Sequence, residues 1–292
     1  MGFGRFEVGP DDYEGPAGRS STSGVIIYPN GGTAAEIEKT LVHEFEHYVQ
    51  PDSLSLPPES IHLQHPIQEG AATYVEVVYA ERYLPSLDPV ADRKSSYVDA
   101  TRNSVKLGAS HYYFGYQYVA QRIDSPKDLS QVYDDPPWSS GQLLHGHDWD
   151  ASRPLRVDVG DSWTKAVRPA GEHFLRVMLA TELNESAAAS AATGWANDTV
   201  VGSNSESGNV WVIRMTDERN ASELRVALER YFGARATPTD EGWRTGGTIY
   251  RLVRVDETTV AIVAGGADFV DAVTVSKDGG TIAVTSEAES RR

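Results

Sequence analysis

Apolar and polar residues alternate with the period of an α-helix between Thr33 and Gln50. The apolar positions of this segment are Ile37, Leu41, Phe45 and Tyr48. Side chains three or four residues apart share one face of a helix, so we expect these four to face a core. Thr33 and Glu36 have the spacing of a capping box, and Pro51 cannot continue the helix. The pattern therefore predicts a helix of about five turns that ends near Gln50.

A second helical pattern covers residues 66–84. Pro66 stands at its start, and proline is favoured as the first residue of a helix. Residues 70–72 are glycine and alanine, so this helix can approach another helix closely. The other segments expected in the first half are a strand at 24–28, helices at 100–107 and 112–123 separated at Gly108, and loops at 85–97 and 124–161.

The period changes after a predicted helix at residues 168–195. Alternating apolar residues typical of strands then appear, interrupted by short helical segments. The expected elements are a strand at 209–215, a helix at 221–232 with Asn220 as cap and Gly233 as stop, a hairpin at 247–255 and 258–263, a helix at 268–273 and a strand at 281–284. The whole pattern predicts an α+β protein: a mainly helical domain with a short sheet over 1–150, and a smaller α+β domain without an evident catalytic cluster over 151–292.

The amino-acid composition is typical of a soluble globular protein and argues against some classes of partner. The 292 residues are 40% hydrophobic and 23% charged, as in soluble globular proteins. Twenty-six basic against 42 acidic residues give a net charge of −16, which argues against nucleic acids or anionic membranes as partners. Only six of the cations are lysine, and excess carboxylate suits a protein kept soluble at very high salt. No apolar run approaches the ~20 residues that span a bilayer.

The absence of cysteine excludes disulfides, thiolate metal sites and thiol catalysis. Residues 1–5 lack the apolar region of a signal peptide. Asn184, Asn197 and Asn220 each stand in an N-x-[ST] triplet, which favours an exported protein. We therefore expect an extracellular or cell-surface location, with any signal or anchor outside this sequence.

The first predicted helix carries a His-Glu-x-x-His motif at His43, Glu44 and His47. Residues four apart on a helix lie on one face, so both imidazoles can bind one ion. Glu44 is close enough to accept a proton from water at that ion. This arrangement is typical of a zinc hydrolase with Glu44 as general base. The alternative is two histidines on the solvated face of an ordinary helix.

A catalytic zinc site of this type needs a third ligand and one open position. Glu69, in the first turn of the next predicted helix, is our candidate. His62 and His65 are rival ligands, and Glu69 could instead be an acid favoured by the helix dipole. Glu76 is the acid we consider as a hydrogen-bond partner for a metal-binding imidazole.

The order His-Glu-x-x-His-x-x-Gln followed by Glu-Gly-x-Ala resembles the gluzincin branch of zinc metallopeptidases. Residues 112–119, 136–145 and 191–198 are similar to a family of zincin-like surface proteins of haloarchaea, over about two thirds of the chain. Gly141 stands where that family usually has an acidic residue. The resemblance implies Zn²⁺ as cofactor and a peptide or protein substrate. It also implies that Tyr112, or else Tyr113 or Tyr116, stabilises the oxyanion; the alternative role for this cluster is aromatic core.

Two functions follow from these motifs. The first is a zinc-dependent peptidase that uses Glu44 as general base. The second is a catalytically silent surface or binding protein that retains a structural zinc site. Glu44 favours the first, because a structural site needs ligands but no base.

Overall fold

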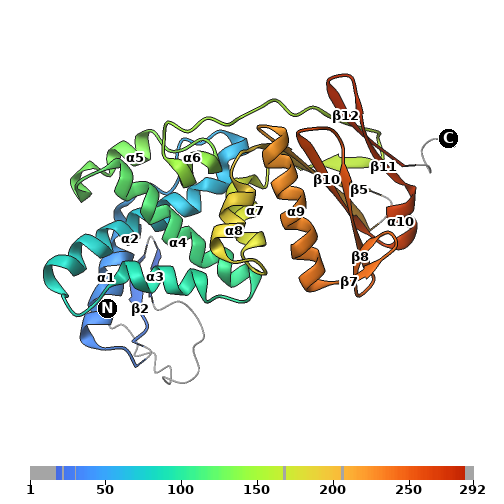
Figure 1. The fold of residues 1–292 in the computed structure, drawn as a ribbon. Helices are drawn as coiled ribbons and strands as arrows, with labels where there is room; N and C mark the ends of the chain where they lie inside the picture. Colours follow the sequence, from blue (N-terminus) through green and yellow to red (C-terminus); the bar gives the residue numbers. More distant parts are fainter. Residues whose placement is uncertain (1–17, 22, 30, 167–168, 205–206, 287–292) are drawn as a thin grey trace. The chain divides into compact units, whose positions relative to one another are not determined.

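The computed structural model describes residues 18–21, 23–29, 31–166, 169–204 and 207–286 (Figure 1). Residues 1–5, examined above for a signal peptide, lie outside this range. The chain forms two compact units and has a mixed α+β composition, as predicted. The first unit contains the described residues of Met1–Ser55, His62–Asp99 and Gly108–Pro136. The second contains Leu56–Ile61, Ala100–Leu107 and the described part of Pro137–Arg292, so its main segment begins before the expected boundary at 150.

Helices dominate the first unit. Its elements are β1 (Gly18–Ser21), β2 (Gly24–Ile27), α1 (Ala34–Val49), α2 (Gln64–Tyr83), α3 (Pro89–Val98), α4 (Asn103–Arg122), whose first turn belongs to the second unit, and α5 (Ser130–Asp134). A short 3-10 turn covers Pro126–Asp128, and another, Pro58–Leu63, begins in the second unit and ends in the first. The helices described here are not long and apolar enough to cross a membrane.

The capping box at the start of α1 is confirmed. The Thr33 hydroxyl accepts a hydrogen bond from the Glu36 backbone N–H, and the Glu36 carboxylate accepts one from the Thr33 N–H at 2.6 Å. These contacts satisfy N–H groups that have no partner within the helix. The helix ends one residue before Gln50, close to the predicted position.

The prediction that the apolar stripe of α1 faces a core is wrong for Phe45 and Tyr48, whereas Ile37 and Leu41 are half-buried. Phe45 and Tyr48 are 52% and 54% exposed, whereas His43, Glu44 and Glu46 are buried. Hydrogen bonds compensate the burial of these polar groups; Glu46, for example, accepts one from the Tyr133 hydroxyl at 2.6 Å. Helix α1 therefore turns the face that carries His43, Glu44 and Glu46 towards the protein interior.

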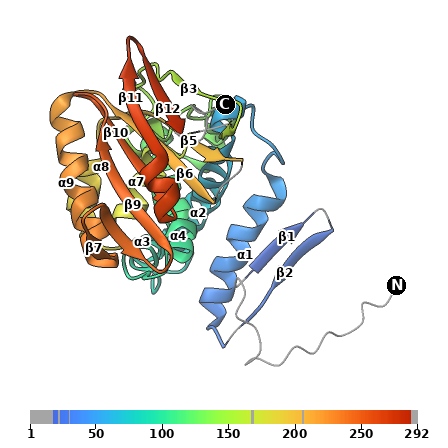
Figure 2. The ribbon, with the colours of Figure 1, turned by 90° about the vertical axis from the view of Figure 1, so that its right-hand side faces the viewer.

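The antiparallel hairpin β1–β2 lies along α1 (Figure 2). Gly18 is the contact point, because a Cβ there would lie 2.6 Å from Cγ and 2.8 Å from Oε1 of Glu44. Only a residue without a side chain lets the strand approach Glu44 this closely. The sequence predicted β2 but not β1.

The prediction that the glycine-containing segment of α2 allows close helix packing is confirmed. A Cβ on Gly70 would lie 2.2 Å from the carbonyl carbon of Gly115 in α4, and a Cβ on Gly115 would lie 1.9 Å from the Pro66 oxygen. The two backbones therefore touch without intervening side chains. This contact fixes the part of α2 that carries Glu69.

Three helix boundaries in the first half differ from the prediction. The second helix begins at Gln64, so Glu69 lies beyond its first turn and the dipole alternative does not apply. Helix α4 continues through Gly108, which has open space around its Cα and costs little in a long helix. The segment predicted as a loop at 85–97 contains α3, which starts with an Asp88 cap and Pro89.

The second unit is built on a seven-stranded antiparallel sheet in the order β4-β5-β6-β10-β9-β8-β7. Its strands are β4 (Trp163–Lys165), β5 (Trp195–Ser203), β6 (Gly208–Met215), β7 (Thr237–Thr239), β8 (Gly242–Thr245), β9 (Thr248–Arg254) and β10 (Thr259–Gly265). A three-stranded sheet contains β11 (Val273–Asp278), β12 (Thr281–Ser286) and β3 (Val157–Val159), with β3 parallel to β12. The helices are α6 (Ser140–His145), α7 (Gly171–Leu179), α8 (Glu185–Ala192), α9 (Glu218–Arg235) and α10 (Ala267–Ala272).

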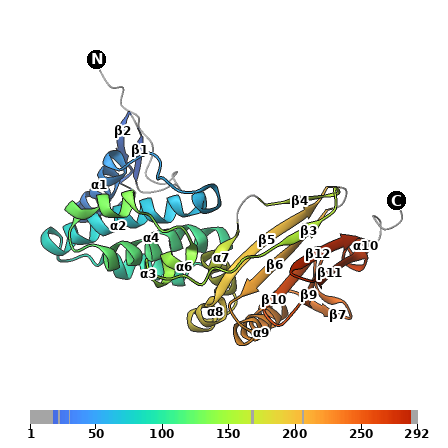
Figure 3. The same cartoon turned by 90° about the horizontal axis from the view of Figure 1, so that it is seen from above.

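Both faces of the larger sheet are covered (Figure 3). Alternate residues point to opposite faces of a strand. Trp211 and Ile262 therefore pack with α7, α8 and α9, whereas Val212 and Ala261 pack with α10 and the three-stranded sheet. This covering explains the continuous apolar run of β10, which is buried along its whole length.

The predicted β9–β10 hairpin, strand β6 and helix α10 are confirmed. The single helix expected at 168–195 is wrong: it is two helices, α7 and α8, and residue 195 opens strand β5. Helix α9 is capped by Asp217 rather than Asn220 and continues through Gly233. Asp217 accepts a hydrogen bond from the Asn220 backbone N–H, so a better cap lay three residues earlier.

Candidate metal centre

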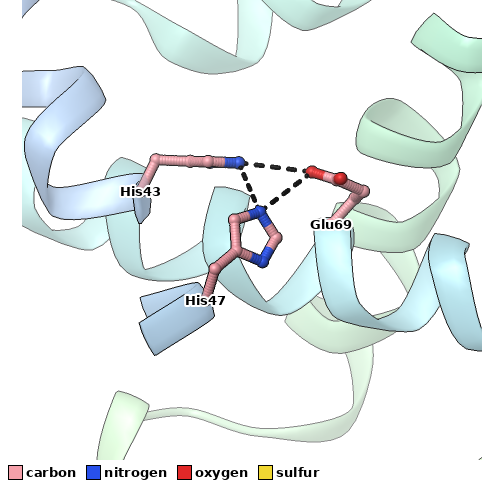
Figure 4. Close-up of side chains that lie close together, drawn as sticks. All are labelled: His43, His47 and Glu69. Carbon is pink, nitrogen blue, oxygen red and sulfur yellow. Dashed lines mark hydrogen bonds and ion pairs between the residues drawn. The ribbon is translucent and has the colours of Figure 1, made fainter. Parts of the chain in front are cut away.

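Three side chains from α1 and α2 converge on one point (Figure 4). The Nε2 atoms of His43 and His47 lie 3.1 Å apart, and Oε2 of Glu69 lies 3.3 and 3.2 Å from them. The helical spacing of the two histidines places both rings on one side of α1. The structure thus brings together the three residues that the sequence nominated as ligands.

The donor set fits a divalent cation. Ligand bonds of about 2.0–2.1 Å in a tetrahedron imply ligand atoms about 3.3 Å apart, close to the edges of this triangle. Two imidazole nitrogens and one carboxylate oxygen suit zinc as well as other first-row metals. All three side chains are buried or half-buried.

His43 is held by a carboxylate behind it. Its Nδ1 lies 2.9 Å from Oε2 of Glu76, the acid considered in the sequence, and the Arg93 guanidinium donates to the same oxygen at 2.7 Å. Because Nδ1–H donates to Glu76, Nε2 is the His43 nitrogen that faces the cluster, and it can bind a cation when it is deprotonated. Arg93 was missed, since it lies in the segment predicted as a loop; the Asp88–Pro89 start signal could have revealed its helix.

Gln50 supports the second histidine. Its side-chain amide lies 2.6 Å from Nδ1 of His47, and Gln50 Oε1 is buried without a hydrogen-bond partner. Rotating the amide by half a turn lets Oε1 accept a hydrogen bond from Nδ1–H of His47. In that orientation Nε2 of His47 faces the cluster and can likewise bind a cation when it is deprotonated.

Burial and the neighbouring groups shift the pKa values of Glu69 and His43 in opposite directions. Burial alone would raise the pKa of Glu69, but hydrogen bonds from His43 and His47 outweigh it and hold the pKa below its usual value. Burial would lower the pKa of His43, but Glu69 and Glu76 outweigh it and raise that pKa. The cluster therefore keeps Glu69 ionised and ready to bind a cation.

Glu44 lies beside this cluster and is not part of it. It is buried under β1, and burial raises the pKa of its carboxyl, although the two neighbouring histidines oppose the rise. A carboxylate with a raised pKa is a stronger base than one in water. Glu44 therefore has the position and the basicity that a general base next to the cluster requires.

Of the three tyrosines named in the sequence, Tyr112 is the one next to the cluster. Its ring stacks on His43 with centroids 5.6 Å apart, and the Arg93 guanidinium lies 4.5 Å from its ring centroid. Burial and the Glu69 charge raise the pKa of Tyr112, so its hydroxyl stays protonated. Tyr113 instead stacks on Tyr97. Tyr116 lies beside Tyr74.

Within the part of the chain that the structure describes, His62 and His65 do not join the converging group. The side chain of His65 is 76% exposed, and its Nδ1 lies 3.9 Å from Oε1 of Glu69. Its ring lies 6.0 Å from that of His111, whose pKa burial lowers to about 4. His65 and His111 therefore flank Glu69 without meeting the imidazoles of His43 and His47.

Gly141 lies in the second unit, far along the chain from this cluster. A Cβ at Gly141 would lie 2.8 Å from the Trp149 ring and 3.4 Å from Oε2 of Glu172. Oε1 of Glu172 pairs with His145 at 2.6 Å. A larger side chain at position 141 would require the Trp149 ring to move.

The similarity of this chain to a known family lies in the second unit. Residues 164–286 match a family model described as a domain of unknown function (DUF8575). No curated protein and no solved structure matches the chain significantly. The matched segment runs from β4 to β12 and excludes the three converging side chains.

Proposed function

We propose that this protein is a zinc-dependent peptidase with a zincin-like first unit of the gluzincin type. His43, His47 and Glu69 would hold the metal, and the substrate would be a peptide or protein. The observation that carries the proposal is the convergence of these three side chains beside a buried, basic Glu44. A purely structural metal site would not require that carboxylate.

Zinc bound at these ligands would supply Lewis acidity, which polarises a carbonyl and makes water a better nucleophile at neutral pH. The protein groups behind the ligands orient them. Glu76 and Arg93 fix the ring of His43, and Gln50 fixes that of His47. This support preserves the ligand geometry when substrate enters.

The remaining steps belong to side chains next to the cluster. Glu44 would accept a proton from the attacking water and deliver it to the nitrogen of the leaving amine. The hydroxyl of Tyr112, kept protonated by its raised pKa, would donate a hydrogen bond to the developing oxyanion. Strand β1, which lies against Glu44, offers backbone groups to an extended substrate.

A matched pair of variants tests the proposal. Glu44→Gln keeps the shape of the side chain but removes the base, so peptide hydrolysis should fall about 10²–10⁴-fold while zinc content stays at that of wild type. Glu69→Ala removes a ligand, so zinc content and hydrolysis should fall together. The measurements are cleavage of an unfolded protein in molar salt, with and without chelator, and elemental analysis of each variant.

Two results would overturn the peptidase. One is an absence of chelator-sensitive cleavage by a zinc-loaded wild type, which would leave the catalytically silent zinc protein as the better account. The other is a Glu44→Gln variant as active as wild type, because the cleavage would then come from another protein. Full zinc retention by Glu69→Ala would refute the ligand set independently of activity.

A further inference from the structure

A pocket of about 530 Å³ opens in the second unit, between the last turn of α9 and the adjacent face of the larger sheet. The sheet leaves space there because the last residue of β10 that points towards α9 has a smaller side chain than the residues before it. Val260 and Ile262 are followed by Ala264, which lies opposite Asn209 of β6. The volume falls within the range of about 300–1,000 Å³ that is usual for small-molecule sites.

Aromatic rings form much of the wall. They are Trp211, Tyr231, Phe232 and Tyr250, which come from β6, α9 and β9. The rings of Phe232 and Tyr250 are stacked, with centroids 4.9 Å apart and planes 25° from parallel. Rigid rings of this kind present flat π faces to a ligand at little entropic cost.

Apart from Arg235, the described polar groups of the wall are uncharged. Asn209, Thr245 and Thr248 contribute an amide and two hydroxyl groups, each of which can both donate and accept a hydrogen bond. Among the residues that the structure describes, the wall has no carboxylate, although the whole chain has a net charge of −16. Its one charged residue, Arg235, is already paired with Glu182 at 3.1 Å.

We propose that this pocket binds a neutral saccharide. The C–H faces of a sugar ring carry slight positive charge and fit the negative faces of aromatic rings. Its hydroxyl groups match amide and hydroxyl partners that both donate and accept. An apolar ligand would make no use of these polar groups, and a charged ligand would find no unpaired counter-charge among the described lining residues.

The test uses the full chain and three neutral probes: maltotriose, cellotriose and tri-N-acetylchitotriose. Calorimetry and saturation-transfer NMR should detect binding of at least one probe at a Kd of about 1 mM or tighter. Ala264→Leu places a larger side chain in the pocket and should weaken that binding at least tenfold. Asn209→Ala, at an exposed position, should weaken it several-fold without affecting the melting temperature.

Ala283→Leu on β12 is the matched control, because it makes the same change in a strand away from the pocket and should leave binding unchanged. The Kd should also be the same in dilute and molar salt, since a neutral ligand has no charge to screen. Failure of all three probes to bind wild type would overturn the proposal, as would an affinity that falls steeply with salt. Binding unaffected by both pocket variants would also overturn it.

Discussion

At the scale of single residues, the histidines of the candidate site depend on groups that do not face the cluster. Glu76 is almost fully buried and bonds to both His43 and Arg93, so it links α1, α2 and α3. Hydrogen bonds from His43 and Arg93 outweigh its burial and hold the pKa of Glu76 below the usual value. A carboxylate that stays ionised here keeps the His43 ring in one tautomer.

We expect Glu76→Gln to weaken zinc binding by about 10–100-fold, because an amide orients the imidazole less strongly than a carboxylate does. Competition with a chelating dye measures the affinity. Glu81→Gln, an exposed change on the same helix, is the control and should bind zinc like wild type. Equal affinities in the two variants would show that Glu76 does not support the ligand.

Asp256 gives a pH-dependent prediction in the second unit. Burial raises the pKa of Asp256, but the Thr258 backbone N–H and Lys277 outweigh this and lower it from 3.8 to about 2. A depressed pKa stabilises the fold at pH values above the unfolded pKa, and this contribution disappears as the pH falls towards 2. Asp256→Asn should therefore cost about 1 kcal/mol at neutral pH and almost nothing near pH 2.

Urea unfolding at both pH values measures this difference. Asp240→Asn, in an exposed turn, is the control and should behave like wild type throughout. A cost for Asp256→Asn that is the same at pH 7 and pH 2 would contradict the assigned role of the charge.

At the scale of elements, the contact between α2 and α4 is the tightest constraint on the candidate site. Gly70 and Gly115 bring two helix backbones together one residue from Glu69. Backbone atoms cannot move aside as a flexible side chain can. An added methyl group must therefore separate the helices and displace Glu69.

Gly70→Ala should lower the free energy of unfolding by about 3 kcal/mol or more, a large value for one methyl group. Gly108→Ala is the matched control, since its Cβ meets nothing within 4 Å and alanine should stabilise α4 by up to about 1 kcal/mol. Urea denaturation of both variants measures these changes. A Gly70→Ala protein as stable as wild type would mean that the helices are not in contact.

At the scale of the whole molecule, net charge decides the response to salt. With −16 at neutral pH, the acidic side chains repel one another at low ionic strength. Because salt screens this repulsion, the melting temperature should rise from dilute buffer to molar KCl. At a pH near the sequence pI of 4.9 the same salt increase should have a much smaller effect. A melting temperature that stays flat or falls at neutral pH would contradict the expected adaptation to salt.

The sequence by itself determined the features that depend on neighbours along the chain. The Thr33–Glu36 capping box, the i, i+4 spacing of His43 and His47 and the β9–β10 hairpin are local, so spacing and residue type suffice to predict them. Glu69 was predictable because its Glu-Gly-x-Ala context allows a helix that packs closely. The mixed α+β class followed from the change of period in the second half.

Tertiary structure decided which face of each element is buried. Helix α1 buries its polar face because Glu69, Glu76 and Tyr133, all distant in sequence, supply its hydrogen-bond partners. Glycines at 108 and 233 do not end their helices, because packing along the rest of α4 and α9 outweighs a cost of about 1 kcal/mol each. The roles of Arg93 and of the pocket beside α9 likewise depend on segments that meet only when the chain folds.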